Sequence, residues 1–228
     1  MSHHSLSKID IKGLMMKLYL NDTSPFSRAV VATALLTKSS SLSLEWVDPW
    51  ASPAELVDAN PFCLIPTLVT KEGITLSESL CICQHLIEVS QSKDLTSIDY
   101  QSVNQVSQLG FAKTLMEIAF RSAALKRYTD ESNELIARGE TGMPVALEKL
   151  NQQLSVDGIK SYLQPNLANL YLHVALDYVQ FRHSAIIKAV ENNNIALLMQ
   201  LSPFAGVLNV IDLEILSTQP SFESLINS

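Results

Sequence analysis

The strand patterns of this chain end near residue 90, although the chain continues to residue 228. Before that point, short alternating apolar segments that favour strands are separated by segments that favour helices. The predicted strands are Lys17–Leu20, Leu42–Val47, Pro66–Val69 and Ile74–Leu76. The predicted helices are Arg28–Lys38, Ala54–Ala59 and a third that Ser77-Glu78-Ser79 opens and that runs to about Val89. This order predicts an α/β unit in the first part of the chain.

Only helical patterns follow the polar segment Ser90–Asp94. The predicted helices are a long one over Ile98–Tyr128, a second that begins near Thr141 or Gly142 and includes Glu148–Leu154, a third over Asn166–Arg182, and shorter ones broken at Ser202-Pro203 and Gln219-Pro220. We therefore expect an α/β domain at residues 16–92 and an all-helical domain at residues 93–228, packed on each other. Residues 1–15 are interpreted as an N-terminal extension or a remnant of cloning.

Composition excludes several classes of function. The net charge is −7, which argues against a nucleic-acid surface, because phosphate binding needs clustered Lys and Arg. No run of 18 or more apolar residues occurs, so we expect no membrane span. The three cysteines do not form a disulfide framework, and Cys81 and Cys83 would point to opposite sides of a helix. A cytoplasmic location fits this cysteine usage best, and His3-His4 is more simply a remnant than a metal site.

Several short segments occur in an order that is informative as a set. They are Lys17-Leu18-Tyr19, Ser24-Pro25-Phe26-Ser27-Arg28, Asn60-Pro61, Ile65-Pro66-Thr67-Leu68, Glu78-Ser79 and Pro220-Ser221-Phe222. Together with the all-helical second half, they resemble a cytosolic glutathione transferase of the kind common in bacteria. The resemblance implies a thioredoxin-like N-terminal domain, an all-α C-terminal domain and usually a homodimer. It implies glutathione as cosubstrate, a small hydrophobic electrophile as second substrate, a role in detoxification, and no metal or redox cofactor.

Ser24 is the catalytic candidate that the resemblance implies. It precedes Pro25 at a predicted helix start, where free N–H groups and the helix dipole favour an anion. Its hydroxyl would stabilise the thiolate of bound glutathione, and lowering a thiol pKa by two units takes about 2.7 kcal/mol. The alternative is that Ser24 only caps the helix. Ser27 is a weaker candidate, and Arg28 is expected to be a structural partner.

The rest of the glutathione site is also carried by the resemblance. Ile65-Pro66 would be a cis-proline turn whose Ile65 backbone pairs with the cysteinyl part of glutathione; the alternative is a trans proline at a strand start. Glu78 and Ser79 would hold the γ-glutamyl end, although both also suit a helix start. Phe26 is assigned to the same site.

One position departs from the family pattern. Many relatives have a small residue followed by Lys or Gln just before the cis-proline pair, whereas this chain has Cys63-Leu64. Leu64 lies in the glutathione site by resemblance but cannot bond the glycyl carboxylate, so the indole N–H of Trp50 is a substitute candidate. Cys63 is interpreted as a buried small residue, with a mixed disulfide as the alternative.

The electrophile pocket would lie between the two domains. Phe26, Met116 and Phe120 are its candidate walls, because Met116 and Phe120 are one turn apart on one helix face. The alternative is that they are core or dimer-interface residues. The charged residues Glu117, Arg121, Lys126 and Arg127 are interpreted as a solvated or interface face.

Three functions follow from these residues. The first is a glutathione transferase in which Ser24 stabilises the thiolate that attacks the electrophile. The second is a transferase-like binding or regulatory protein with little or no activity, which Leu64 favours. The third, a thiol transferase or reductase, ranks lowest because Ser24 and Ser27 stand where it needs a cysteine.

Overall fold

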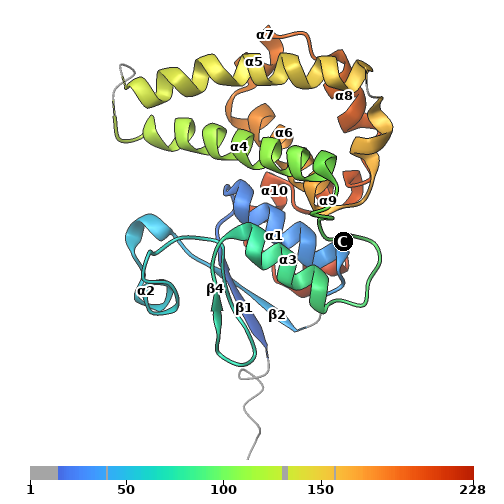
Figure 1. The fold of residues 1–228 in the computed structure, drawn as a ribbon. Helices are drawn as coiled ribbons and strands as arrows, with labels where there is room; N and C mark the ends of the chain where they lie inside the picture. The colour runs from blue at the N-terminus through green and yellow to red at the C-terminus, as the bar shows by residue number, and fades with distance from the viewer. Residues whose placement is uncertain (1–14, 40, 130–132, 157) are drawn as a thin grey trace, which may run out of the picture.

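The computed structural model describes residues 15–39, 41–129, 133–156 and 158–228, so the expectation for residues 1–14 lies outside the described residues. A four-stranded sheet with the order β2-β1-β3-β4 forms from the first part of the chain (Figure 1). Strand β1 (Met16–Leu20) is parallel to β2 (Leu42–Trp46) and antiparallel to β3 (Thr67–Val69), which is antiparallel to β4 (Thr75–Leu76). Strands β2, β3 and β4 lie within the predicted segments, and β1 begins one residue before the predicted Lys17–Leu20.

Helices α1 (Pro25–Leu36) and α3 (Ser79–Val89) pack on each other and lie between the sheet and the helical half (Figure 1). The short helix α2 (Ala54–Ala59) follows a 3-10 turn at Pro49–Ala51, and both lie at one end of the sheet. One face of the sheet is packed against the core: Leu18, Leu20 and Leu68 point to it, because Leu68 is the register partner of Leu18, and all three are fully buried. The first part of the chain is therefore the expected α/β unit.

The second part of the chain is helical. Its helices are α4 (Val103–Leu125), α5 (Glu134–Val156), α6 (Leu167–Arg182), α7 (Ser184–Ala189), α8 (Asn193–Gln200), α9 (Ala205–Val210), α10 (Leu213–Leu216) and α11 (Phe222–Ile226), with a 3-10 turn at Ile159–Leu163. Helix α6 is central: it packs on α4 and α1, and most of its residues are buried. The Oδ1 of Asn166 accepts from the N–H of Asn169 at 3.0 Å, so an asparagine caps this helix.

The expected start of the second long helix near Thr141 or Gly142 is wrong. Helix α5 begins at Glu134 and continues through Gly139, Gly142 and Pro144. Glycine and proline have low helix propensity, but tertiary packing outweighs local propensity here. Ile136, Met143 and Leu147 are buried to 1% exposure or less, so the helix keeps one continuous apolar stripe on its inner face.

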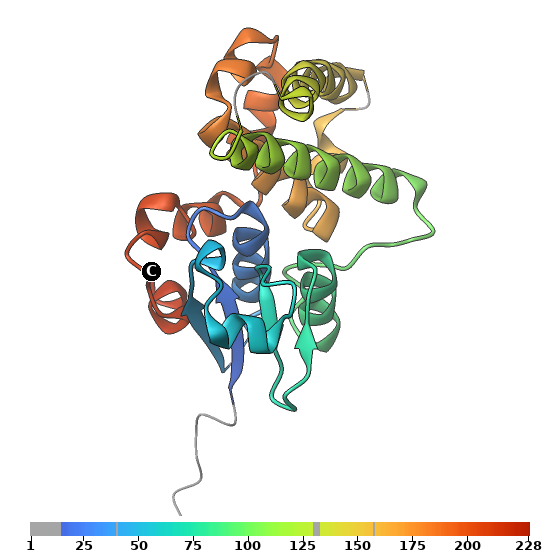
Figure 2. The same ribbon diagram turned by 90° about the vertical axis from the view of Figure 1, so that its left-hand side faces the viewer.

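The C-terminal segments return to the sheet. Figure 2 shows α11 beside β2, and the indole N–H of Trp46 donates to the carbonyl of Pro220 at 3.1 Å. The Nε–H of Arg28, which is 1% exposed, donates to the carbonyl of Ile211 at 3.1 Å, and its Nη1 lies 2.6 Å from Asp177 Oδ2. Arg28 is thus the structural partner that the sequence suggests, and it joins α1 to both α6 and the C-terminal segment.

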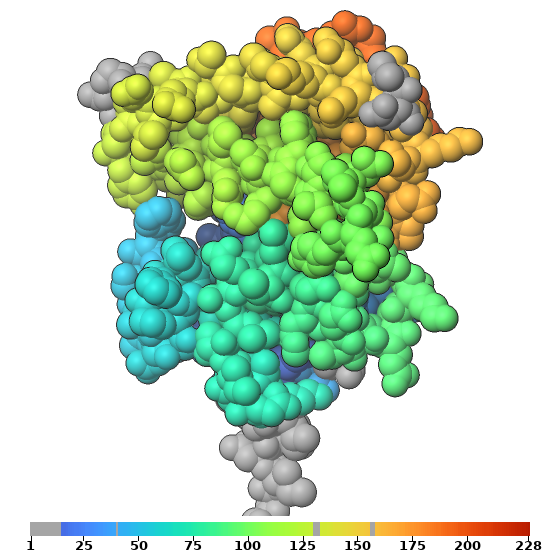
Figure 3. Space-filling model, viewed as in Figure 1, coloured from blue at the N-terminus to red at the C-terminus, as the bar shows by residue number. Residues whose placement is uncertain are grey.

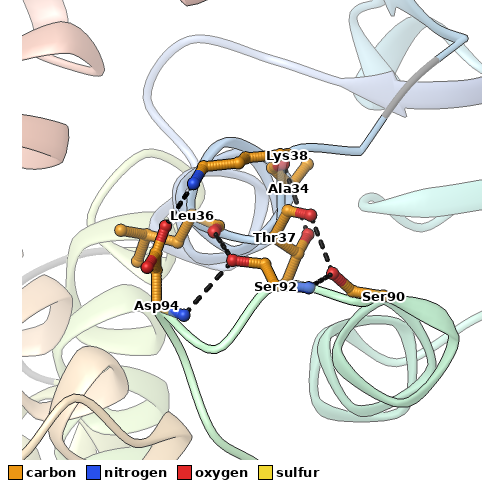
Figure 4. A network of polar contacts seen from close by, with 7 residues as sticks. All are labelled: Ala34, Leu36, Thr37, Lys38, Ser90, Ser92 and Asp94. Carbon is orange, nitrogen blue, oxygen red and sulfur yellow. Dashed lines mark hydrogen bonds and ion pairs between the residues drawn. The ribbon is translucent and has the colours of Figure 1, made fainter.

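The segment that connects the two halves is bonded to the end of α1 (Figure 4). The Oγ–H groups of Ser90 and Ser92 donate to the carbonyls of Thr37 and Leu36, at 2.8 and 3.1 Å, and Lys38 pairs with Asp94 at 2.7 Å. These bonds satisfy carbonyls that the last turn of a helix leaves free. The division at residues 92 and 93 itself stays a prediction.

No single helix among the described residues is long and apolar enough to cross a membrane, and one bent pair, Asn193–Gln200 with Ala205–Leu216, passes that test only together. Within the described ranges, no group of three or more His, Cys, Asp or Glu side chains could hold a metal ion.

Candidate functional site

A cavity of about 1050 Å³ lies between the sheet half and the helical half. Figure 3 shows the hollow beside α2, below the C-terminal part of α4. Its floor comes from the turn after β1, the loop after β2, the turn before β3 and the start of α3, and its roof comes from the ends of α4 and α6. Segments far apart in the sequence therefore meet around one space.

Ser24 lines this cavity at the start of α1. Its Oγ accepts from the N–H of Ser27 at 3.2 Å, and its own N–H donates to Oδ1 of Asn21 at 2.9 Å. Ser24 therefore caps α1, as the capping interpretation predicts. Because Oγ is the acceptor in the capping bond, its hydrogen remains available to a ligand. Ser27 is fully buried and does not line the cavity.

The peptide bond between Ile65 and Pro66 is cis, which agrees with the expectation from the resemblance. Asn60 Nδ2 donates to the carbonyl of Leu64 at 3.2 Å and to Thr67 Oγ1 at 2.9 Å, and these bonds fix the turn. The backbone N–H and C=O of Ile65 form no hydrogen bond with any other described residue. Ile65 lines the cavity, and its backbone has the free donor and acceptor that an extended ligand needs for strand-like pairing.

Glu78 and Ser79 line the same cavity at the start of α3. Glu78 has a φ of 67°, a left-handed conformation that is uncommon for a residue with a side chain. Its exposed carboxylate forms no capping hydrogen bond, so the capping interpretation does not hold for its side chain. The neighbouring Ser79 is buried, and its Oγ accepts from the hydroxyl of Tyr171 at 2.6 Å. Backbone conformations like that of Glu78 cluster at functional sites.

The mouth of the cavity is partly apolar. Leu64 is 59% exposed and Trp50 is 55% exposed, and the Trp50 ring lies 5.1 Å from the ring of Tyr128 between centroids. Cys63 is half-buried rather than buried, and its Sγ–H donates to the carbonyl of Pro49 at 3.4 Å. All of these residues except Tyr128 line the cavity, so Leu64 and Cys63 do face the predicted site.

One predicted wall residue is wrong. Phe120 lines the cavity and contacts Phe26 edge to face, with 5.5 Å between ring centroids. Met116, one turn earlier, is fully buried and does not line it. Four residues along an α-helix rotate a position by about 40°, so Met116 lies in the buried core whereas Phe120 reaches the cavity.

The basic and aromatic residues of the roof were not predicted from the sequence. Lys126, Arg127, Tyr178, Arg182 and His183 line the cavity, although Lys126 and Arg127 were interpreted as a solvated or interface face. They stand at the ends of α4 and α6, where cations also suit the helix dipole. No local signal shows that two helix ends meet, so the sequence alone could not have found this group.

Burial shifts the pKa values of two of these groups. The pKa of Tyr178 is raised mainly by burial, while the positive charges of Arg182 and Arg127 act in the opposite direction. The pKa of His183 is lowered, mainly by burial, and its Nε2–H donates to the carbonyl of Ala119 at 2.8 Å. At neutral pH the roof therefore presents a protonated phenol and an uncharged imidazole beside the charged residues.

The chain is similar to known proteins in part of its sequence and in its fold. The family model described as glutathione S-transferase, N-terminal domain, matches residues 23–89. A search of the curated proteins gave no match.

Solved structures of the same fold come from several organisms. A glutathione S-transferase from Methylobacillus flagellatus with glutathione bound has a TM-score of 0.68 at 19% identity, over 84% of this chain and 98% of that one. A glutathione transferase family member from Pseudomonas fluorescens, also with bound glutathione, has a TM-score of 0.71 at 19% identity, over 90% and 98%. A glutathione S-transferase from the Antarctic clam Laternula elliptica has a TM-score of 0.70 at 15% identity, over 93% and 99%.

The resemblance in the sequence and the expected fold, a thioredoxin-like unit followed by an all-α part, are thus confirmed. Residues 23–89 match the model of the glutathione S-transferase N-terminal domain, and the chain as a whole has the glutathione transferase fold.

Proposed function

We propose that the protein binds glutathione in the cavity and joins its sulfur to a hydrophobic electrophile. One observation carries this proposal: Ser24, the free backbone of Ile65 and the pair Glu78-Ser79 line one continuous space. These are a hydroxyl at a helix start, an unpaired strand-like backbone and a carboxylate beside a helix start. Each matches one part of an extended zwitterionic tripeptide.

Ser24 would act on the thiol. A free thiol has a pKa of about 8.5, so only a few per cent is thiolate at neutral pH. The Oγ–H of Ser24 would donate to the thiolate, and the N-terminus of α1 would add favourable potential. The thiol proton leaves to solvent, the thiolate attacks the electrophilic carbon, an S–C bond forms and the leaving group departs. A charge-assisted hydrogen bond and a helix dipole together supply about the 2 to 3 kcal/mol that a shift of two pKa units needs.

The remaining contacts would hold the peptide. The N–H and C=O of Ile65 would pair with the cysteinyl residue, and the carboxylate of Glu78 would bind the γ-glutamyl ammonium. The start of α3, with Ser79, would bind the γ-glutamyl carboxylate. The wall formed by Phe26 and Phe120 would receive the electrophile.

Leu64 supports a second candidate, a transferase-like binding or regulatory protein. Its exposed side chain stands where a polar residue would bond the glycyl carboxylate, and it offers no hydrogen bond. The indole N–H of Trp50 is the substitute donor at the mouth. In this second function glutathione or a related peptide binds, but no electrophile is turned over. The homodimer, the cytoplasmic location and a role in detoxification stay predictions.

The experiment is a calorimetric titration of glutathione into the purified protein, followed by turnover of a generic aryl halide. We expect micromolar to low-millimolar binding that Glu78→Gln reduces at least tenfold, because it removes a charge-assisted bond. Glu55→Gln is the matched control, since Glu55 is an exposed acid on the neighbouring helix α2 and does not line the cavity. Binding with turnover supports the transferase, and binding without turnover supports the second candidate. No binding at several millimolar contradicts both.

A further inference from the structure

The charged residues that line the cavity are separated by sign. The acidic lining residues of the sheet half are Asp22, Asp48 and Glu78, and this half contributes no Lys or Arg to the lining. The helical half contributes Lys126, Arg127 and Arg182. Its one acidic lining residue, Glu117, is paired with Lys113 on the same helix. In a chain of net charge −7, the roof of the cavity is thus a local positive region.

Two of these cations have no carboxylate partner among the described residues. Lys126 pairs with Glu140 at 2.5 Å, but the structure shows no such ion pair for Arg127 or Arg182. Instead, the guanidinium carbon of Arg182 lies 4.1 Å from the centre of the Phe181 ring, which holds the side chain without neutralising it. A half-buried guanidinium that faces a cavity is suited to bind an anion.

Tyr178 adds a neutral donor to this region. It is only 3% exposed and lines the cavity, and a phenol is protonated at neutral pH. The helix dipole explains why cations are stable at the ends of α4 and α6. The dipole does not explain why these cations line the same cavity as the buried phenol of Tyr178. Donors of this kind around one space form a binding site for a carboxylate or a similar anion.

The wall beside these donors is apolar. Phe26, Phe120, Ala123 and Ala124 line the cavity between the floor and the roof. A ligand that fills this region would have an apolar, ring-sized body and an anionic end.

We propose that the second substrate is an apolar electrophile, such as an activated aromatic ring, that carries a carboxylate or other anionic group bound by Arg182 with help from Arg127 and Tyr178. This inference rests on the proposed transferase function. It names the class of electrophile, which neither the fold nor the family determines.

The test compares an acid with its neutral analogue. The probes are para-chloro-meta-nitrobenzoate and its primary amide, with glutathione at saturation. The thiolate attacks the carbon that bears chlorine, the S–C bond forms, and chloride leaves. The quantity measured is the ratio of kcat/KM for the acid to kcat/KM for the amide. The acid and the amide differ in intrinsic reactivity, but this difference is the same in every variant, so it cancels when the ratio is compared between variants. We expect Arg182→Gln to lower the ratio about tenfold and Arg127→Gln about threefold, since Arg127 is more exposed.

Two further variants keep the result interpretable. Arg182→Lys keeps the charge and should retain more of the ratio than Arg182→Gln, even if loss of the stacked guanidinium lowers stability. Arg121→Gln removes the same charge from an exposed position on α4 that does not line the cavity, and it should leave the ratio unchanged. A ratio that is the same in Arg182→Gln and in the unaltered protein overturns the inference.

Binding of the two S-aryl glutathione conjugates, measured by calorimetry, tests the same point without turnover. Tighter binding of the acid than of the amide, lost in Arg182→Gln, supports the inference even in a protein without activity. If Arg182→Gln weakens glutathione itself by the same factor, the cation serves the glycyl carboxylate and the inference is wrong. If neither glutathione nor either conjugate binds, the proposed function fails and the inference fails with it.

Discussion

The hydroxyl of Tyr171 donates a hydrogen bond of 2.6 Å to the Oγ of Ser79, and both groups are buried between α6 and α3. Tyr171 belongs to the helical half, whereas Ser79 is the first residue of α3 and lines the cavity. Because Ser79 Oγ is the acceptor in this bond, its own hydrogen can be directed to a ligand. A residue of the core thus fixes the orientation of a hydroxyl in the proposed glutathione site.

We expect Tyr171→Phe to weaken glutathione binding about fivefold. Loss of one buried hydrogen bond costs about 1 kcal/mol, and the Ser79 hydroxyl would no longer be held in one orientation. Calorimetry of Tyr171→Phe, Ser79→Ala and the double variant measures the coupling. If Tyr171 acts through Ser79, its effect on binding disappears when Ser79 is already alanine. A loss of thermal stability with unchanged affinity would instead show that the bond is only structural.

Ser24→Ala separates capping from thiol activation. We expect the pKa of bound glutathione to rise by about one to two units, because the thiolate loses its hydroxyl donor while the helix dipole remains. The affinity for glutathione should change little, and helix α1 should lose about 1 kcal/mol of capping stability. Ultraviolet absorbance of the thiolate, followed as a function of pH, measures the pKa.

The matched control for this variant is Ser102→Ala. Ser102 caps α4 through its Oγ, which accepts from the N–H of Gln105 at 3.4 Å, and it does not line the cavity. This variant should lose a comparable amount of stability and leave the thiol pKa unchanged. An unchanged thiol pKa in Ser24→Ala would leave Ser24 as a cap alone.

Two histidines make the stability of the protein depend on pH. His173 is fully buried on α6, and burial lowers its pKa; the pKa of His183 is lowered for the same reason. Well above pH 6.5 both are neutral in the folded and the unfolded protein, so they contribute no pH dependence there. As the pH falls through about 6.5, the unfolded chain takes up protons first, and the free energy of unfolding decreases. The decrease continues until the pH reaches the lowered pKa of the folded state.

Urea unfolding at several values between pH 7.5 and pH 5 measures this slope, which is at most about 1.4 kcal/mol per pH unit for each histidine. We expect His173→Gln to flatten it, whatever its effect on stability at pH 7.5. His85→Gln, on the half-buried side of α3, is the control. A slope that is equally steep in His173→Gln would contradict the assignment.

The parts of the site that the sequence could predict are local. A cap at Ser24, a turn at Ile65-Pro66 and a helix start at Glu78-Ser79 each depend on neighbouring residues, so short motifs were enough to find them. The cationic roof could not be found in this way, because Arg127 and Arg182 come together only through the packing of α4 on α6. Met116 was misplaced for the same reason: the face of a helix that meets another helix depends on tertiary packing.

The start of α5 shows how a residue type can be interpreted in two ways. The predicted start of this helix was near Thr141 or Gly142, but both Gly139 and Gly142 lie inside the helix. At Gly139 the reason is a close contact with α4: a Cβ at this position would lie 2.2 Å from Ser122 Oγ and 3.3 Å from Ile118 Cγ2. The glycine is needed for helix packing, and glycine also serves at loop ends, so the sequence could not distinguish the two uses.

Substitution of Gly139 tests this explanation. We expect Gly139→Ala to lower the free energy of unfolding by about 1 to 3 kcal/mol, because the overpacked contact outweighs the gain of about 1 kcal/mol in helix propensity. Gly110→Ala is the matched control, since Gly110 lies inside α4 and a Cβ there meets nothing within 4 Å. That variant should be as stable as the unaltered protein or up to about 1 kcal/mol more stable. Urea unfolding measures both.

Ser122→Ala removes the hydroxyl nearest to the new methyl group, so it should restore part of the stability of Gly139→Ala. If Gly139→Ala were as stable as Gly110→Ala, α4 and α5 would not be in close contact at this point, and the glycine would need another explanation.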